Sequence, residues 1–448
     1  MLSNRLHVWL CLIATGFVPP ACKSRSSSSA PATSAAPPAV SFRAPVWEIK
    51  MPGGYAENAT KASAIGEQLV VVTPASVVVF DRRSGKKSWG IGGFGKPFDP
   101  DITLTEDVVV IAQRNTSGSD IGVYDLSTGK ELWHLQFSGG AGFANAVYTS
   151  DGSCNRCPVV RRDLHTGKPK WSVTGEGFPG MMLSKLGPAA TGSMLAYRGG
   201  PYVVLMSSDG KDARLYAVDA ETGARHASMP SVKGMYLITD RTLVGADPES
   251  KECKVLLRGV DIQTGKSRWQ TELKVVIDEW TNSACPGRPH ALFSDASFLG
   301  IAPNTLFSID AEDRPIALDL DTGVVRWRGP SGLLPIDADE RTVLVRDPSG
   351  LQLERNDQHL RGRLAALDAA TGKLLWKAPG PPVHASYPVT AVYGDIALDG
   401  DLEGGKQITV RNARTGVEMQ PVEGSLIGAG PGWLVAKYID MLRYYTLP

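Results

Sequence analysis

The fold of this chain is decided by one stretch of sequence, Leu364-Ala365-Ala366-Leu367-Asp368-Ala369-Ala370-Thr371-Gly372-Lys373-Leu374-Leu375-Trp376. The apolar run predicts a strand. Asp followed by Thr-Gly predicts a hairpin turn, because a carboxylate accepts backbone N–H groups and glycine adopts a positive φ. The tryptophan four residues after the glycine opens the next strand and offers a large flat surface. The stretch therefore predicts a strand-turn-strand unit whose indole packs against a neighbouring unit.

The same pattern occurs eight times, always with the same spacing between the turn-forming residue and the glycine. Seven copies keep the aspartate: Asp81, Gly85 and Trp89; Asp125, Gly129 and Trp133; Asp163, Gly167 and Trp171; Asp219 and Gly223; Asp261, Gly265 and Trp269; Asp319, Gly323 and Trp327; and Asp368, Gly372 and Trp376. A weaker eighth copy has Asn412 and Gly416. The tryptophan position holds Ala227 in the fourth copy and Gln420 in the eighth.

The distance between copies predicts the architecture. Successive copies lie 38 to 58 residues apart, and most of these gaps match the length of a four-stranded propeller blade. We expect an all-β protein, a β-propeller of about eight four-stranded blades within residues 45–448, with seven to nine blades as the range. Trp47 stands in phase with the repeats, and residues 433–438 and 441–445 look like strands that lack a partner. The N-terminal strand is therefore expected to pair with the C-terminal blade and close the ring.

The amino-terminal residues predict export and membrane attachment. Residues 1–22 resemble a lipoprotein-type signal peptide, with a short apolar stretch before Pro19-Pro20-Ala21-Cys22. Lipidation of Cys22 is expected, although Pro19 departs from the usual aliphatic residue, and simple cleavage near Ala21 is the alternative. Residues 23–44 are rich in Ser, Ala and Pro and predict a disordered tether. A protein of the cell envelope, lipid-anchored in the outer membrane and facing the periplasm, is the expectation.

Composition and cysteine usage narrow the function classes. The net charge is +1 and there is no basic run, which argues against a nucleic-acid partner. In an oxidising compartment Cys154, Cys157, Cys253 and Cys285 are candidates for disulfides, and their connectivity stays open. The Asp399–Gly404 run imitates the start of a calcium loop, but Val410 stands where a bidentate carboxylate is expected, so we interpret it as a hairpin turn. No catalytic, cofactor-binding or metal-binding residue is predicted.

Residues 364–376 closely resemble the ideal repeat of the pyrroloquinoline-quinone-type β-propeller family, and the resemblance extends over residues 45–448. One branch of that family, the quinoprotein dehydrogenases, carries a quinone and calcium and often an adjacent Cys-Cys pair, which this sequence lacks. The other branch is the propeller lipoprotein of the outer-membrane β-barrel assembly machinery. This chain resembles it in length, signal, tether and closing strand order.

The resemblance implies a non-catalytic scaffold without a cofactor, held in the envelope by a lipid anchor. Its implied partners are envelope proteins, including the outer-membrane β-barrel assembly complex. Two alternatives remain at this point, a sensor or ligand-binding propeller and a quinone-dependent dehydrogenase, because fold alone does not determine activity.

Overall fold

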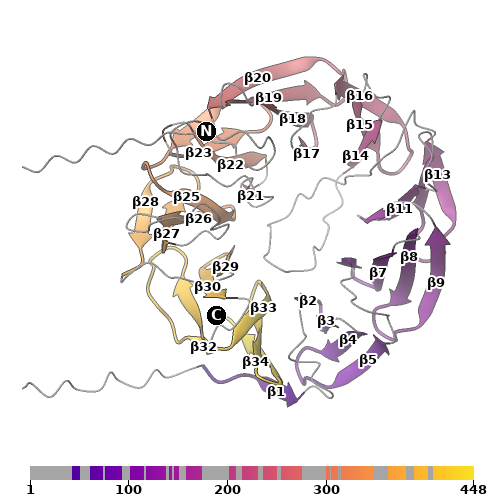
Figure 1. The fold of residues 1–448 in the computed structure, drawn as a ribbon, viewed down its shortest axis with the longest axis vertical. Coiled ribbons are helices and arrows are strands. Elements are labelled where there is room, and N and C mark those ends of the chain that lie inside the picture. The colour runs from indigo at the N-terminus through magenta and orange to yellow at the C-terminus, as the bar shows by residue number, and fades with distance from the viewer. Residues whose placement is uncertain are drawn as a thin grey trace, which may run out of the picture. The chain divides into compact units, whose positions relative to one another are not determined.

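The computed structural model of the protein describes a chain of short β-strands. The described residues are 43–448, apart from residues 51–60, 74–75, 93–100, 116–117, 138–140, 144–145, 151–157, 174–200, 208–213, 231–235, 250–253, 275–298, 303, 311, 313, 348–361, 380–387 and 402–406. In these residues the strands form nine small antiparallel sheets, which follow one another around a ring (Figure 1). The expected signal peptide, Cys22 and most of the expected tether lie outside the described residues. Within the described part, no helix is long and apolar enough to cross a membrane.

Four-stranded sheets account for the first three blades, named here from the inner strand outward. Blade 1 consists of β2 (Lys61–Ile65), β3 (Gln68–Thr73), β4 (Ser76–Asp81) and β5 (Lys87–Gly92). Blade 2 consists of β6 (Asp101–Leu104), β7 (Val108–Asn115), β8 (Gly118–Asp125) and β9 (Glu131–Phe137). Blade 3 consists of β10 (Ala141–Phe143), β11 (Val147–Ser150), β12 (Val159–Arg162) and β13 (Pro169–Val173).

The next three blades repeat this order. Blade 4 has three strands among the described residues, β14 (Tyr202–Ser207), β15 (Arg214–Asp219) and β16 (Arg225–Pro230). Blade 5 consists of β17 (Tyr236–Ile238), β18 (Thr242–Glu249), β19 (Lys254–Asp261) and β20 (Ser267–Lys274). Blade 6 consists of β21 (Leu299–Ala302), β22 (Thr305–Ile309), β23 (Pro315–Asp319) and β24 (Val325–Arg328).

The last three blades bring the two ends of the ring together. Blade 7 consists of β25 (Leu334–Ala338), β26 (Thr342–Asp347), β27 (Arg363–Asp368) and β28 (Leu374–Lys377). Blade 8 consists of β29 (Pro388–Tyr393), β30 (Ile396–Asp401), β31 (Gln407–Asn412) and β32 (Val422–Glu423). Blade 9 consists of β33 (Ser425–Gly430), β34 (Trp433–Tyr438), β35 (Met441–Thr446) and β1 (Trp47–Lys50).

The middle strands are buried on both faces because each blade is packed between two others. In β3 and β4, five successive residues of each strand are buried, Leu69–Thr73 and Ser76–Phe80. Their sequences are accordingly near-continuous runs of valine rather than an alternation of apolar and polar residues. A strand of this kind is stable only when a neighbouring blade covers each face, so the blades depend on one another.

Nine blades lie within the predicted range of seven to nine, and one beyond the expected number of about eight. Two sheets decide the count. The short interval of 38 residues between the second and third motifs still contains a complete blade 3, built from short strands. Blade 9 is a further sheet that carries no Thr-Gly turn of its own, and its four strands come from both ends of the chain.

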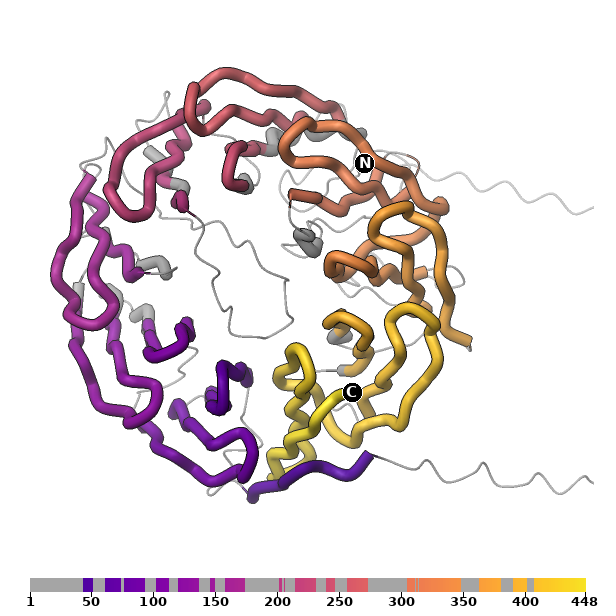
Figure 2. Tube along the Cα trace, turned by 180° about the vertical axis from the view of Figure 1, so that it is seen from behind, coloured from indigo at the N-terminus to yellow at the C-terminus, as the bar shows by residue number. Residues whose placement is uncertain are grey.

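The predicted ring closure is confirmed. β1 pairs antiparallel with β35, and Trp47 lies opposite Tyr444. The two rings stack with their centroids 5.2 Å apart. Figure 2 shows the indigo N-terminal strand lying along the outside of the yellow C-terminal strands. Pairing β1 with β35 covers the outer edge of the last blade, which protects the sheet from association with other chains.

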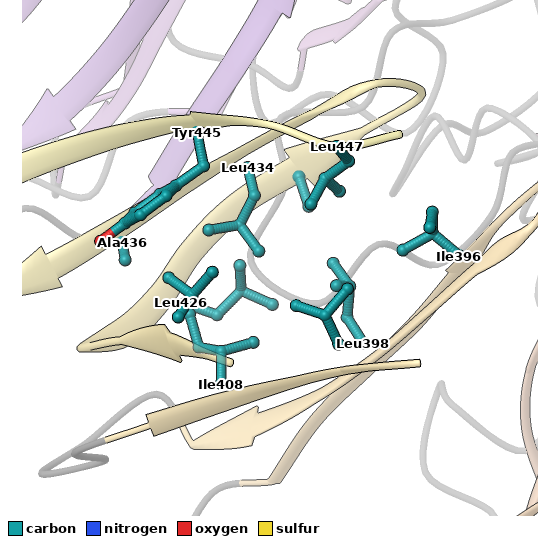
Figure 3. Close-up of a cluster of buried hydrophobic side chains, with 11 residues drawn as sticks. Ile396, Leu398, Ile408, Leu426, Leu434, Ala436, Tyr445 and Leu447 are labelled. Atoms are coloured by element: carbon teal, nitrogen blue, oxygen red, sulfur yellow. The ribbon is translucent and has the colours of Figure 1, made fainter. Parts of the chain in front are cut away.

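Hydrophobic clusters fill the seams between blades. At the seam between blades 8 and 9, Leu398 and Ile408 of blade 8 meet Leu426, Leu434 and Tyr445 of blade 9 (Figure 3). All five side chains are at most 2% exposed. An equivalent cluster joins blades 9 and 1 across the closure of the ring. The core of the protein is therefore a set of interfaces between sheets.

Candidate interaction surfaces

The repeated turns have the same hydrogen bonds in all eight copies. The Oδ1 atom of each turn-forming residue, Asp in seven copies and Asn412 in the eighth, accepts the backbone N–H three residues later at 2.7–2.9 Å. In blade 2 the hydroxyls of Ser127 and Thr128 also bond to Asp125, and these bonds lower the pKa of that carboxyl to about 2. The motif aspartates are thus occupied as acceptors inside their own turns.

Seven tryptophans pack on the turn glycine of the next blade. A Cβ atom on each of these glycines would lie under 3.0 Å from the indole that covers it, so only glycine fits there. Each indole Nε1 also donates to a turn carbonyl of the next blade at 2.7–3.1 Å. The pairs are Trp47 on Gly85, Trp89 on Gly129, Trp133 on Gly167, Trp171 on Gly223, Trp269 on Gly323, Trp327 on Gly372 and Trp376 on Gly416.

The fourth copy, which lacks the tryptophan, closes its seam by a different contact. The backbone N–H of Ala227 donates to the carbonyl of Ile262 in blade 5 at 3.0 Å. Beside it, the ring of Tyr202 packs edge-on against His226, 5.3 Å between centroids. The amide of Gln263 donates to the Tyr202 hydroxyl at 2.5 Å. The backbone of β16 has thus taken over the hydrogen bond that an indole makes elsewhere.

The eighth copy lacks the tryptophan for a different reason. The blade that follows is blade 9, whose third and fourth strands come from opposite ends of the chain and are joined by no turn. A segment before β1 contacts blade 8 instead, because the backbone N–H of Arg43 donates to the carbonyl of Pro421 at 2.8 Å. Gln420 therefore stands where an indole would have no turn glycine to cover.

Antiparallel strand order gives the ring two different faces. Wherever successive described strands of one blade are joined, the first-to-second and third-to-fourth connections lie on one face, which we call the turn face. The second-to-third connections and the crossings between blades lie on the other, the connection face. The turn-face connections between described strands are short, and they include the eight repeated turns. The connections that span residues 275–298 and 348–362 both start and end at the connection face.

Charged side chains are buried at the seam between blades 7 and 8. Arg346 is 1% exposed and forms a bidentate ion pair with Asp399 of blade 8. Its guanidinium also donates to the Thr390 hydroxyl at 2.6 Å and to the Gly362 carbonyl at 3.2 Å. Since Asp399 is engaged by Arg346, this pair joins two blades, and the start of the calcium-like run is used for packing.

A buried carboxyl lies at the same seam, on the innermost strands. Asp337 is 1% exposed, and its Oδ2 atom accepts the backbone N–H of Val392 in blade 8 at 2.7 Å. Burial raises the pKa of Asp337 to about 8. A raised carboxyl pKa is typical of acid catalysts, but such a group must reach a substrate. Asp337 has almost no exposed surface, so we assign it to packing. Its only sequence signal is an aspartate within an apolar strand.

The predicted cysteine sites cannot be placed on this surface. Cys22, Cys154, Cys157, Cys253 and Cys285 lie outside the described residues. Among the residues that are described, no three His, Cys, Asp or Glu side chains are grouped so that they could hold a metal ion.

Comparison with known protein families identifies one that matches this chain. A family model described as outer membrane protein assembly factor BamB matches residues 74–235 and 254–424. No curated protein sequence matches the chain.

The solved structures that the chain resembles differ strongly from it in sequence. BamB from Moraxella catarrhalis shares 13% identity with a TM-score of 0.45, covering 90% of this chain and 99% of that one. A eukaryotic initiation factor shares 12% identity with a TM-score of 0.53, covering 92% of both chains. A europium-containing methanol dehydrogenase shares 15% identity with a TM-score of 0.40, covering 88% of this chain and 84% of that one. At this level of identity the likeness to the initiation factor supports the fold alone.

Proposed function

Because the chain belongs to the family of the outer membrane protein assembly factor BamB, we propose that it is a non-catalytic scaffold that binds proteins in the cell envelope. Outer-membrane protein assembly is the process we assign to it. The observation that carries the proposal is the family match, which extends over both halves of the ring. The ring itself supports the proposal, because the motif aspartates and tryptophans are occupied by turns and seams.

We assign partner binding to the connection face. The turn face is built from short, repeated hairpins held by indole contacts. The connection face receives the long connections at residues 275–298 and 348–362, and the two differ in length and sequence. Binding residues are commonly carried on variable connections that a rigid scaffold positions. A closed ring of nine sheets is such a scaffold.

The proposal includes a lipid anchor on Cys22, with residues 23–44 as the tether. Support comes from the order of an apolar segment, a cysteine and a Ser/Ala/Pro-rich segment before the first strand. Metabolic labelling with a fatty acid tests the anchor directly. Label is expected in the wild-type chain and absent from a Cys22→Ser variant. Equal labelling of the two forms contradicts the assignment.

Co-purification from membranes tests the scaffold function. The tagged full-length protein is expressed in its own host, the membranes are solubilised in mild detergent, and bound proteins are identified. Recovery of an outer-membrane β-barrel assembly component is expected, and recovery of the tagged protein alone contradicts the assembly role. In a parallel assay, purified protein receives the quinone and calcium. A stoichiometric quinone absorbance together with alcohol oxidation would contradict the non-catalytic assignment.

A further inference from the structure

The residue that follows the turn glycine differs in charge and polarity from blade to blade. Five of the eight repeated turns carry an exposed lysine there, Lys86, Lys130, Lys168, Lys266 and Lys373. In blades 6 and 8 the same position holds Val324 and Val417, which are 59% and 63% exposed. Valine suits the start of a strand, but here it also places an exposed apolar group where five other turns carry a charge. Its use in these two turns calls for a surface explanation.

Exposed apolar side chains are concentrated in this part of the ring. The described residues contain five large hydrophobic side chains that are strongly exposed, and four lie on the turn face of consecutive blades 6 to 9. We call these four the apolar arc: Val324 of blade 6, Leu374 of blade 7, Val417 of blade 8, and Val46, which precedes the outer strand of blade 9. The fifth, Ile439, lies in the β34–β35 turn on the connection face. Apolar residues scattered singly over a surface need no explanation, but four on one arc of one face do.

The turns that carry the arc are held together rigidly. Trp327 of blade 6 covers the turn glycine of blade 7, and Trp376 of blade 7 covers that of blade 8. The guanidinium of Arg414 in the blade 8 turn also bonds to Asp368 in the blade 7 turn at 2.8 Å. Figure 2 shows these orange and yellow hairpins following one another around the rim, with the N-terminal strand next in line. The arc is therefore one continuous edge of a stiff body.

The N-terminal segment joins the ring beside the arc. Arg43 bonds to Pro421 of blade 8, Val46 donates to the Tyr444 carbonyl at 2.8 Å, and the indole of Trp47 then covers the turn glycine of blade 1. These contacts place the start of the described chain on the turn face. About 20 residues separate Cys22 from Arg43, and at most about 3.5 Å per residue limits the tether to roughly 70 Å. A short tether keeps weak surface contacts effective, because it holds their local concentration high.

We propose that the apolar arc rests on the lipid bilayer surface to which the chain is tethered. The proposal builds on the lipid anchor of the proposed function. Apolar side chains flanked by lysines suit the boundary between headgroups and acyl chains, where the apolar groups insert and the ammonium groups meet anionic headgroups. Several acidic side chains on the same face have basic or imidazole partners, which weakens their opposition to this contact. Glu67 is paired with Arg83, Asp107 with His165, and Asp395 with Arg341.

This contact orients the ring. With the turn face on the bilayer, the connection face points away from the membrane and is open to proteins that approach from the aqueous side. Docking of the arc thus sets the orientation in which the anchored protein presents its partner-binding face.

Hydrogen exchange on vesicles tests the docking. The mature chain carries a hexahistidine tag in place of the acylated cysteine and is bound to phosphatidylethanolamine–phosphatidylglycerol vesicles that contain a nickel-chelating lipid. Amide exchange in the turns of blades 6, 7 and 8 is expected to slow at least fivefold relative to the protein in solution. The β34–β35 turn on the opposite face is expected to exchange at an unchanged rate.

Two variants separate the arc from general surface effects. The triple variant Val324→Asp, Leu374→Asp, Val417→Asp is expected to lose the protection, and Ile439→Asp, which changes an equally exposed apolar residue on the other face, is expected to keep it. Unchanged exchange of the wild-type arc on vesicles would overturn the proposal. So would arc protection in solution that rises with protein concentration, which would identify a second copy as the occupant. The nickel lipid replaces the natural anchor, so neither failed lipidation nor a missing protein partner affects this result.

Discussion

Single residues at the repeated turns stabilise the protein mainly through their contacts with a neighbouring blade. The turn glycines show this most clearly, because each one needs a positive φ and seven of them also lie under an indole. Gly265 is the exception. No atom lies within 4 Å of a Cβ built there, because the fourth blade has alanine at the tryptophan position. The chain therefore contains its own control for separating backbone strain from packing.

Gly129→Ala and Gly265→Ala form a matched pair. Both substitutions place alanine at a positive φ, 71° and 67°, which costs about 1–2 kcal/mol. At Gly129 the new methyl group would lie 2.6 Å from the Trp89 indole. Overpacking should therefore cost about 1–3 kcal/mol more at this position. Urea unfolding of the two variants measures the difference. Equal losses of unfolding free energy would show that the indole contact imposes no steric requirement.

Asp337 predicts a pH dependence of stability. Its pKa is about 8 in the folded protein against 3.8 for the free side chain, so the folded state retains a proton that the unfolded chain releases. The contribution is fully present below about pH 4 and is lost as the pH rises to about 8. Asp337→Asn keeps an acceptor for the Val392 N–H and does not titrate. At pH 9 the free energy of unfolding of the variant should exceed that of the wild type by on the order of a few kcal/mol.

Chemical denaturation at pH 5 and pH 9 checks this prediction. Other ionisable groups are common to both proteins, so the difference between variant and wild type isolates residue 337. A difference that does not change with pH would mean that Asp337 is ionised within the folded ring.

At the scale of the element, a strand is stabilised by the blades on either side of it. The second and third strands of a blade bury both faces, and the seams between blades hold both the apolar clusters and the buried ion pair. The outer strand of blade 8 illustrates the dependence. Only Val422 and Glu423 are regular in β32, and the segment around Arg43 adds a hydrogen bond to the carbonyl of Pro421.

Arg346→Met should destabilise the protein strongly. It removes the partner of Asp399, whose side chain is only 13% exposed, and an uncompensated buried charge costs about 3–5 kcal/mol. The exposed pair of Arg83 and Glu67 is the control, and Arg83→Met should cost less than about 1 kcal/mol. Unfolding curves of both variants give the comparison. The double change Arg346→Met, Asp399→Leu should recover much of the loss, and failure to recover would place the destabilisation elsewhere.

At the scale of the whole molecule, the ring is closed by a strand that no turn connects to its blade. β1 reaches blade 9 through its pairing with β35 and through the Trp47 indole, which touches both Tyr444 and the turn of blade 1. The other six covering indoles belong to strands that a hairpin joins to the rest of the blade. The indole contact of Trp47 should therefore contribute more to stability than the same contact in other blades, because it also holds β1 in place.

Trp47→Ala should weaken the protein more than Trp89→Ala. Each change removes an indole from a turn glycine and costs about 3–5 kcal/mol locally. In Trp47→Ala the strand β1 can also detach, exposing the edge of β35. Faster amide exchange throughout β1 and β35 is expected in this variant, with a lower thermal midpoint than Trp89→Ala. Similar midpoints and unchanged exchange in β35 would contradict a closing role for Trp47.

The repeat by itself determined that this protein is a closed ring of strands, since the turn chemistry and the indole position are local properties of each copy. It also indicated the closure, because Trp47 stands in phase with the repeats. The number of blades required the tertiary structure, because blade 3 occupies the shortest interval between motifs and blade 9 carries no Thr-Gly turn of its own.

Contacts between blades other than those of the repeated indoles were decided only by folding. The seam beside Ala227, the ion pair of Arg346 and the buried Asp337 join residues that lie 35 to 55 positions apart and follow no repeated spacing. The apolar arc has the same origin, because its members are ordinary exposed residues until the ring sets them on one face. Sequence periodicity predicts the structure within one blade, whereas the other contacts at seams and the composition of each face depend on which blades become neighbours.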